Sequence, residues 1–207
     1  NDHYGVPKEM NHEEIARIVL GFQEAARRSL EAGYELIEIH GAHGYLIHQF
    51  LSPLSNHRTD EYGGSTENRV RFLKEITEAV KSVLPKDFPL ILRVSATDYV
   101  EGGIDIQEMV KIIDLVKEEY DMIHVSSGGL HVDQEITLYP GYQVKFSETL
   151  KKECGVETIA VGLITEVGQV EEILQNNRAD LVALGRVLLR DPFVIIREGH
   201  GHVTPLF

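Results

Sequence analysis

A short stretch behind an apolar segment carries the residue types that could do chemistry. The mostly apolar residues 36–39 are followed by His40, His43 and Tyr45. A neutral histidine can donate an N–H to an oxygen on which negative charge develops, and a tyrosine hydroxyl can donate a proton. This combination suits the reduction of a carbon–carbon double bond conjugated to a carbonyl. The alternative is that the histidines only make structural hydrogen bonds in a loop, and their spacing alone leaves both interpretations open.

A metal site is a third interpretation of the same stretch, because His48 and His57 follow nearby. A zinc site of the HExxH type needs a glutamate directly after its first histidine. Residues 40–43 read HGAH and lack it. The spacing therefore gives little support to a metal site, and we expect none.

Arg93 interrupts the apolar segment 89–95. Burying a guanidinium group is costly unless the group is paired. A carboxylate such as Glu38 on a neighbouring strand would be a structural partner. A cofactor with an electron-rich ring or a phosphate would be a functional one, and the sequence favours neither.

Glycines close three successive apolar segments in the second half of the chain. Backbone N–H groups can approach an anion closely where a strand ends on glycine, and a phosphate site after the last two strands is common in β/α barrels. Arg186 would add positive charge to such a site. The three strand ends are Ser126-Ser127-Gly128-Gly129, Val161-Gly162-Leu163 and Leu184-Gly185-Arg186.

The tract at 56–64, NHRTDEYGG, is dense in hydrogen-bonding side chains. We expect it to fold its own loop through internal salt bridges and caps. It would then support the site without taking part in chemistry.

Helical and apolar segments alternate along the chain, which predicts a parallel sheet with right-handed crossovers. Asn11 and Glu14 form a capping-box pattern at the first helix. Further helices are expected from Ser65 or Thr66, over 105–119, over 143–153, from a Thr165 cap, and from Asp191-Pro192, with a long loop over 44–64. The predicted strands are 35–40, 89–95, 121–126, 157–162 and 180–185.

Composition narrows the class of protein. The chain has 207 residues, 43% hydrophobic residues and a formal net charge of −13. The absence of a basic block argues against nucleic acid and against an anionic membrane surface, and no apolar run reaches the roughly 20 residues of a membrane span. The polar, acidic N-terminal stretch does not resemble a signal peptide. With Cys154 as the single cysteine, no internal disulfide can form, and a reducing cytoplasm is expected.

The segments EIHGAHGYLIHQFLSP and NHRTDEYGGSTENR resemble the Old Yellow Enzyme family of FMN-dependent, NADH- or NADPH-driven ene-reductases, in its bacterial His-x-x-His branch. The resemblance implies an FMN-binding TIM barrel that reduces the C=C bond of α,β-unsaturated carbonyl compounds, with hydride from the flavin N5. His40 and His43 would bind the substrate carbonyl, His40 also touching the flavin, and Tyr45 would donate the proton. The implied cofactor-binding residues are His40, Arg93 at the flavin N1/C2-oxygen region, Ser127, Gly128, and, at the phosphate, Gly162, Gly185 and Arg186.

The chain departs from the family in its number of strands. The family barrel has eight, and residues 1–207 match only the fourth to the eighth, as a single partial barrel domain. We expect a homo-oligomer or the missing barrel segment to close it, and poor FMN binding by the chain alone. Two alternatives stay open: the barrel segment of an iron–sulfur flavoenzyme such as a dienoyl-CoA reductase or amine dehydrogenase, and a non-catalytic barrel fragment.

Overall fold

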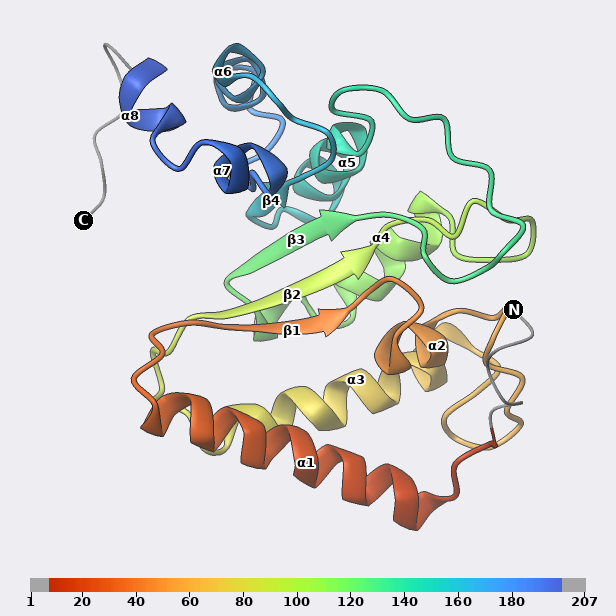
Figure 1. Cartoon of the computed structure of the whole chain (residues 1–207). Helices are drawn as coiled ribbons and strands as arrows, with labels where there is room; N and C mark the ends of the chain where they lie inside the picture. The colour runs from red at the N-terminus through yellow and green to blue at the C-terminus, as the bar shows by residue number, and fades with distance from the viewer. Residues whose placement is uncertain (1–7, 199–207) are drawn as a thin grey trace.

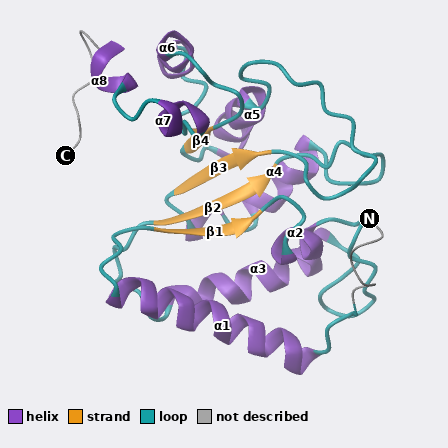
Figure 2. Cartoon of the chain, in the orientation of Figure 1, coloured by secondary structure: helices purple, strands orange, loops and turns teal. Residues whose placement is uncertain are grey.

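The computed structural model describes residues 8–198. Its centre is a parallel sheet of five strands in the order β1-β2-β3-β4-β5 (Figures 1 and 2). The strands are β1 (Ile37–Gly41), β2 (Leu90–Ser95), β3 (Met122–Ser126), β4 (Thr158–Ala160) and β5 (Leu181–Val182). A parallel sheet whose strand order follows the chain order, with helices between the strands, is part of a TIM barrel. The predicted fold class is therefore confirmed in its partial form.

Helices separate the strands along the chain. They are α1 (His12–Glu31), α2 (Leu46–Leu51), α3 (Thr66–Lys81), α4 (Ile106–Asp114), the short 3₁₀ helix η1 (Lys117–Glu119), α5 (Val144–Cys154), α6 (Val167–Gln175), α7 (Arg186–Arg190) and α8 (Val194–Glu198). Asn11 caps α1 together with Glu14 in the predicted capping box, and Ser65 caps α3. None of the helices within residues 8–198 is long and apolar enough to cross a membrane.

The helices cover one face of the sheet. α1 and α3 run side by side below β1 to β3 in Figure 1. Leu92 and Val94 of β2 point to this face and are fully buried, as are Leu73 and Ile76 of α3. Burial of such side chains contributes about 1.5–3 kcal/mol each to folding, so this face holds the main core.

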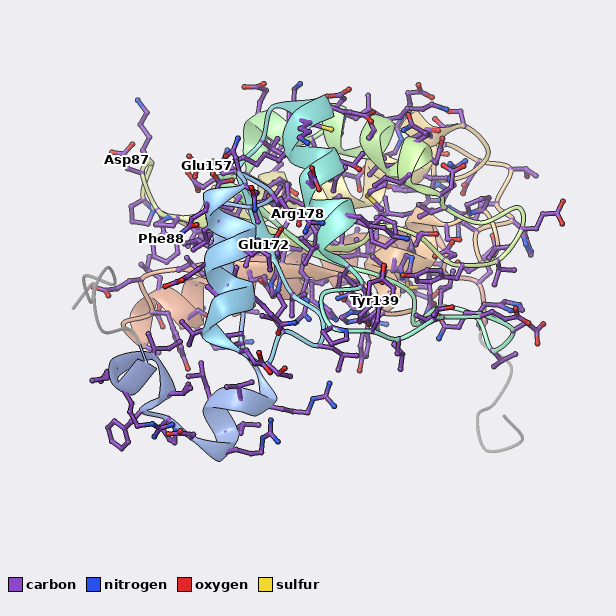
Figure 3. All side chains as sticks on the ribbon, turned by 90° about the horizontal axis from the view of Figure 1, so that it is seen from above. Asp87, Phe88, Tyr139, Glu157, Glu172 and Arg178 are labelled. Atoms are coloured by element: carbon purple, nitrogen blue, oxygen red, sulfur yellow. The ribbon has the colours of Figure 1, made fainter. Side chains whose placement is uncertain are left out.

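The last strands and helices form a smaller layer. Its core is the cluster of Val144, Ala160, Ile164, Ile173 and Ala179. Arg178 ties α5 to α6, because its Nε donates to Glu148 Oε2 at 2.9 Å and its Nη1 to Glu172 Oε2 at 3.2 Å. Figure 3 shows Arg178 beside Glu172 on α6.

The other face of the sheet is polar. Side chains alternate between the faces of a strand, so Glu38 and His40 of β1 share the face opposite the helices. His40 is in register with Arg93 of β2, and Arg93 with His124 of β3. This face carries the groups that the sequence marked as candidates.

Several element boundaries differ from the predictions. The loop expected over 44–64 contains α2, because Ile47, Phe50 and Leu51 are spaced to bury one side of a helix. The helix expected over 105–119 ends at Asp114, since Val116 has a φ of −132° and turns its side chain into the core.

The C-terminal part differs in a similar way. Glu166, not Thr165, precedes the first residue of α6, because Gln169 Oε1 accepts from the backbone N–H of both residues. Pro192 lies in a turn before α8 and does not open the helix. α7 was not predicted. The strands expected at 157–162 and 180–185 shorten to β4 and β5, because β5 is an edge strand paired only with β4.

Candidate functional site

The predicted catalytic side chains gather at the C-terminal end of β1. The ring centroids of His40 and His43 lie 5.1 Å apart, and those of His40 and Tyr45 lie 5.2 Å apart. His40 and His43 are partly buried, while Tyr45 is 63% exposed. The three groups can therefore act on one small molecule at the C-terminal ends of the strands.

The backbone between these residues takes an unusual path. His43 and Gly44 both have left-handed φ angles, of 57° and 74°. For a residue with a side chain this conformation costs about 1–2 kcal/mol, so other contacts must hold it. The backbone N–H of His43 donates to Ser95 Oγ at 3.0 Å, and that of Gly44 donates to His48 Nδ1 at 3.0 Å.

His48 belongs to a buried polar network behind the loop. Since its Nδ1 accepts from Gly44, its Nε2 carries the proton and donates to Asp98 Oδ1 at 2.9 Å. Asp98 also accepts from Ser52 Oγ at 2.6 Å and from the backbone N–H of Ile104 at 2.8 Å. Both ring nitrogens of His48 are thus occupied, and it cannot serve as a metal ligand.

His57, the other histidine of the metal interpretation, is exposed and lines a separate cavity of about 250 Å³. The cluster with metal-ligand spacing in residues 8–198 is His12, Asp60 and Glu61, and it includes none of the predicted site residues. Asp60 there already accepts from Arg58 Nε at 3.0 Å. The hydrogen bond between Arg58 and Asp60 is an internal contact of the 56–64 tract.

That tract supports the site as predicted. Asn56 Nδ2 donates to the carbonyls of Phe50 and Tyr62, each at 2.7 Å. Arg58 Nη1 donates to the Met10 carbonyl at 2.7 Å. The tract closes on itself and on the end of α2, which holds α2 and the preceding Tyr45 in place.

Arg93 lies in the polar face near Glu38, which also contacts His124. Glu38 Oε1 is 4.0 Å from Arg93 Nη1, and Glu38 Oε2 is 2.6 Å from His124 Nδ1. The structural partner foreseen for Arg93 is therefore present, but only at the limit of an ion pair. Arg93 Nε and His124 Nε2 are buried and have no hydrogen-bond partner among the described residues. Because a buried donor without a partner is costly, Arg93 retains capacity to bind a ligand.

Arg93 also lines a cleft of about 840 Å³. Gly162, Gly185 and Arg186 line the same cleft, so the structure brings together three strand ends that are far apart in the sequence. Gly162 has a φ of 129°, and a Cβ there would lie 2.8 Å from Gln143 Nε2. The cleft wall therefore needs glycine at this position.

Ser127 and Gly128 do not line this cleft. Ser127 Oγ donates to Gln143 Oε1 at 2.6 Å, and the backbone N–H of Gly128 donates to the Thr97 carbonyl at 2.8 Å. Gln143, which does line the cleft, was missed by the sequence analysis. The one available signal was its position at the start of the helix predicted over 143–153, which singles out no function.

Electrostatics keep both histidines neutral. Burial lowers the pKa of His43 to about 4, and the nearby Arg93 guanidinium adds to this effect. Burial and Arg93 also lower the pKa of His40, although the Glu38 carboxylate opposes them. Near neutral pH each ring therefore has one N–H and one lone pair, as a hydrogen-bond donor to a carbonyl oxygen requires.

A parallel sheet with titratable side chains and a glycine–arginine cleft at its strand ends has the arrangement of a β/α-barrel enzyme. The sequence profile of the NADH:flavin oxidoreductase / NADH oxidase family matches residues 1–203, and the chain belongs to this family. The resemblance to Old Yellow Enzymes is thereby confirmed.

A relative described as NADPH dehydrogenase, from Clostridium acetobutylicum, is 63% identical over 191 residues, which are 92% of this chain and 56% of that protein. The chain thus spans about half the length of this relative. An Old Yellow Enzyme homologue from Zymomonas mobilis superposes with a TM-score of 0.77 at 25% identity, over 99% of this chain and 57% of that one. A 2-naphthoyl-CoA reductase in complex with 2-naphthoyl-CoA superposes with a TM-score of 0.86 at 28% identity, over 93% of this chain and 30% of that one.

Proposed function

We propose that the chain is the later part of an FMN-dependent NAD(P)H oxidoreductase that reduces the C=C bond of α,β-unsaturated carbonyl compounds. The observation that carries the proposal is the grouping of the His40, His43 and Tyr45 rings within about 5 Å of His40. The name NADPH dehydrogenase of the 63% identical relative supports the same class of reaction.

The residues present fit FMN. Arg93 Nε is a buried donor without a partner, and it lies on the cleft that Gly162, Gly185 and Arg186 also line. In this proposal Arg186 and the glycine N–H groups hold the phosphate, and Arg93 approaches the flavin ring. His40 lies next to Arg93 in the strand register and would contact the ring as well. Ser127 would contribute at the edge of the site through Gln143, and Gly128 through Ser95, whose hydroxyl donates to the Gly128 carbonyl.

The chain's own residues would supply binding and proton chemistry. His40 and His43 donate N–H groups to the substrate carbonyl oxygen and stabilise the negative charge that develops on it, an effect of about 3–4 kcal/mol for one well-placed donor. Tyr45 donates a proton to the substrate α-carbon. The chemistry that bound FMN would supply is hydride transfer, from NADPH or NADH and on to the substrate β-carbon.

The rest of the pocket must come from outside these residues. The 191 residues matched by the 63% identical relative are only 56% of that protein, and β1 and β5 are the edges of the sheet. We propose that residues 1–207 form one partial barrel domain, closed by the remaining barrel segment or by a second copy. A cytoplasmic location fits this class of NAD(P)H-dependent chemistry.

A second candidate is the barrel segment of a larger flavoenzyme. The TM-score of 0.86 to the 2-naphthoyl-CoA reductase and of 0.82 to a histamine dehydrogenase from Rhizobium favours it. Both are only 28% identical to this chain, so the 63% identity to the NADPH dehydrogenase keeps the first candidate ahead. Iron analysis of the full-length protein separates the two, because the iron–sulfur flavoenzyme of the second candidate would contain iron.

The test uses the full-length protein loaded with FMN. NADPH should bleach the flavin absorbance, and cyclohexenone should restore it. In His40→Ala the bleaching should persist while the recovery slows by about 100-fold or more. Normal recovery in this variant would refute the assigned role of His40, and failure of NADPH to bleach the flavin in the wild type would refute the proposed class.

A further inference from the structure

Two serines at the ends of neighbouring strands contact the candidate histidine His43 in different ways. Ser95 of β2 and Ser126 of β3 are in register, and both are buried. Ser95 Oγ accepts from the His43 backbone N–H at 3.0 Å, whereas Ser126 Oγ lies 2.7 Å from Nε2 of the His43 ring. Only Ser126 therefore touches the part of His43 that carries its chemistry.

The direction of the Ser126 hydrogen bond follows from its neighbours. Gln143 Nε2 lies 3.0 Å from the Val161 carbonyl. A backbone carbonyl can only accept, so the Gln143 amide donates there and turns its Oε1 towards the two serines. That oxygen accepts from Ser127 Oγ at 2.6 Å and lies 3.2 Å from Ser126 Oγ.

The Ser126 hydroxyl proton thus has two acceptors within reach. One is the second lone pair of Gln143 Oε1, at 3.2 Å, beside the 2.6 Å bond that this oxygen takes from Ser127. The other is the lone pair of His43 Nε2 at 2.7 Å, a usual length for a strong bond from a hydroxyl group. The shorter distance favours the imidazole.

We propose that Ser126 donates its hydroxyl proton to His43 Nε2 and so fixes His43 in the tautomer with its proton on Nδ1. Ser126 is then a positioning residue, because it acts through His43. Among residues 8–198 no hydrogen bond to His43 Nδ1 is found. Nδ1–H is therefore the group that His43 can offer to a substrate carbonyl oxygen, a step that rests on the function proposed above.

The neutrality of His43 makes its tautomer decisive. With burial holding the pKa of His43 near 4, the ring has a single proton at neutral pH. Which nitrogen carries it is set by the hydrogen bond at the other one. Without Ser126 the ring would return to the preference of free histidine for a proton on Nε2, and Nδ1 would present a lone pair to the carbonyl oxygen.

The first test needs neither flavin nor substrate. In the chain with ¹⁵N-labelled histidine, the ¹⁵N shifts of His43 should show a protonated Nδ1 and an unprotonated Nε2 at pH 7. In Ser126→Ala the proton should move predominantly to Nε2, and Ser126→Thr, which keeps the hydroxyl, should behave as wild type. Ser95→Ala is the matched control. It removes the hydroxyl group that contacts the His43 backbone and not its ring, so it should leave the tautomer unchanged.

Two outcomes would overturn the proposal. One is a wild-type His43 that carries its proton on Nε2, a result that stands even if Ser126→Ala does not fold. The other is an equal tautomer change in Ser95→Ala, which would trace the effect to the position of the loop.

A second test separates this inference from the proposed function. In the FMN-loaded full-length protein, Ser126→Ala should slow reoxidation by cyclohexenone about tenfold or more. Reduction by NADPH should not change. Ser126→Thr should be reoxidised at the wild-type rate. If the tautomer changes as expected but reoxidation does not, Ser126 sets the tautomer and the role of His43 in enone binding is wrong. If the tautomer does not change, the inference itself fails.

Discussion

His48 Nε2 lies 2.9 Å from Asp98 Oδ1, and neither side chain is exposed to solvent. The same imidazole accepts the Gly44 N–H through its Nδ1 at 3.0 Å. A buried pair thus holds the backbone between His43 and Tyr45, far from the position of Asp98 in the sequence. His43 and Tyr45 lie on a loop, but a buried network behind that loop fixes their geometry.

Asp98→Ala should destabilise the chain by roughly 3–5 kcal/mol, because it leaves the donors of His48, Ser52 and Ile104 buried and unpaired. Urea unfolding measures this loss. Asp114→Ala is the control, since Asp114 pairs only with Lys117 at an accessible position and its removal should change stability little. Equal effects of the two substitutions would mean that the buried network does not stabilise the fold.

The sequence predicted the order of the elements better than their ends. Apolar segments and capping residues such as Asn11 act locally, so their signals lie in the sequence itself. α2 was missed because its apolar face is interrupted by His48, which appeared to be a loop histidine. Only the contact between His48 and Asp98 shows that this histidine belongs to the interior, and a contact between distant residues has no signal in one sequence.

In the site, too, the sequence indicates what depends on single residues and not what depends on contacts between distant residues. His40, His43, Tyr45 and Arg93 were singled out as candidates because their types are unusual at strand ends. Gln143 was missed because a glutamine before a helix is ordinary, and its importance comes from lying between Ser126, Ser127 and the Val161 carbonyl. Residue types identify candidates, whereas hydrogen-bond direction appears only once the strands are placed side by side.

His43 should contribute to the pH dependence of stability between about pH 6.5 and pH 4. Its pKa is near 6.5 in the unfolded chain and about 4 in the folded one, mainly through burial. The unfolded state therefore binds the proton first as the pH falls, so the stability due to neutral His43 decreases from pH 6.5 to pH 4 and levels off below.

Urea unfolding of the wild type and of His43→Gln at several pH values in this window measures that contribution. The stability of His43→Gln should fall less steeply with decreasing pH, and His57→Gln, which removes an exposed imidazole, should keep the wild-type slope. Identical slopes for the wild type and His43→Gln would contradict the lowered pKa.

Tyr45→Phe should impair one half of the proposed reaction. Loss of a positioned proton donor typically slows proton transfer by about 10²–10⁴-fold, so enone-dependent reoxidation of the FMN-loaded full-length protein should slow by that order. Flavin reduction by NADPH should not change, since it needs no proton from Tyr45. Because Tyr45 is 63% exposed, its hydroxyl adds little to stability, and the variant should fold normally. Stopped-flow absorbance resolves the two half-reactions, and equal slowing of both would argue against the proton-donor role.

The chain alone should bind FMN poorly. Arg93, Gly162, Gly185 and Arg186 line one side of the cleft, while β1 and β5 leave the sheet open at both edges. Titration of FMN with the purified chain, followed by flavin fluorescence, should give a half-saturation point well above the FMN concentration. Tight stoichiometric quenching would show that the cofactor cradle is complete within these 207 residues.

Gly44→Ala should be more damaging than the same change at Gly64. Both glycines have left-handed φ angles, of 74° and 81°, so each substitution should cost about 1–2 kcal/mol of backbone strain. A Cβ at Gly44 would also lie 2.5 Å from the Gly129 carbonyl oxygen, whereas nothing lies within 4 Å of one at Gly64. The loops after β1 and β3 cannot move apart at Gly44 without displacing the residues beside His43. The total loss of folding stability in Gly44→Ala should therefore reach roughly 2–4 kcal/mol. Chemical denaturation of the two variants measures the difference, and equal losses would show that the loops after β1 and β3 can separate at little cost.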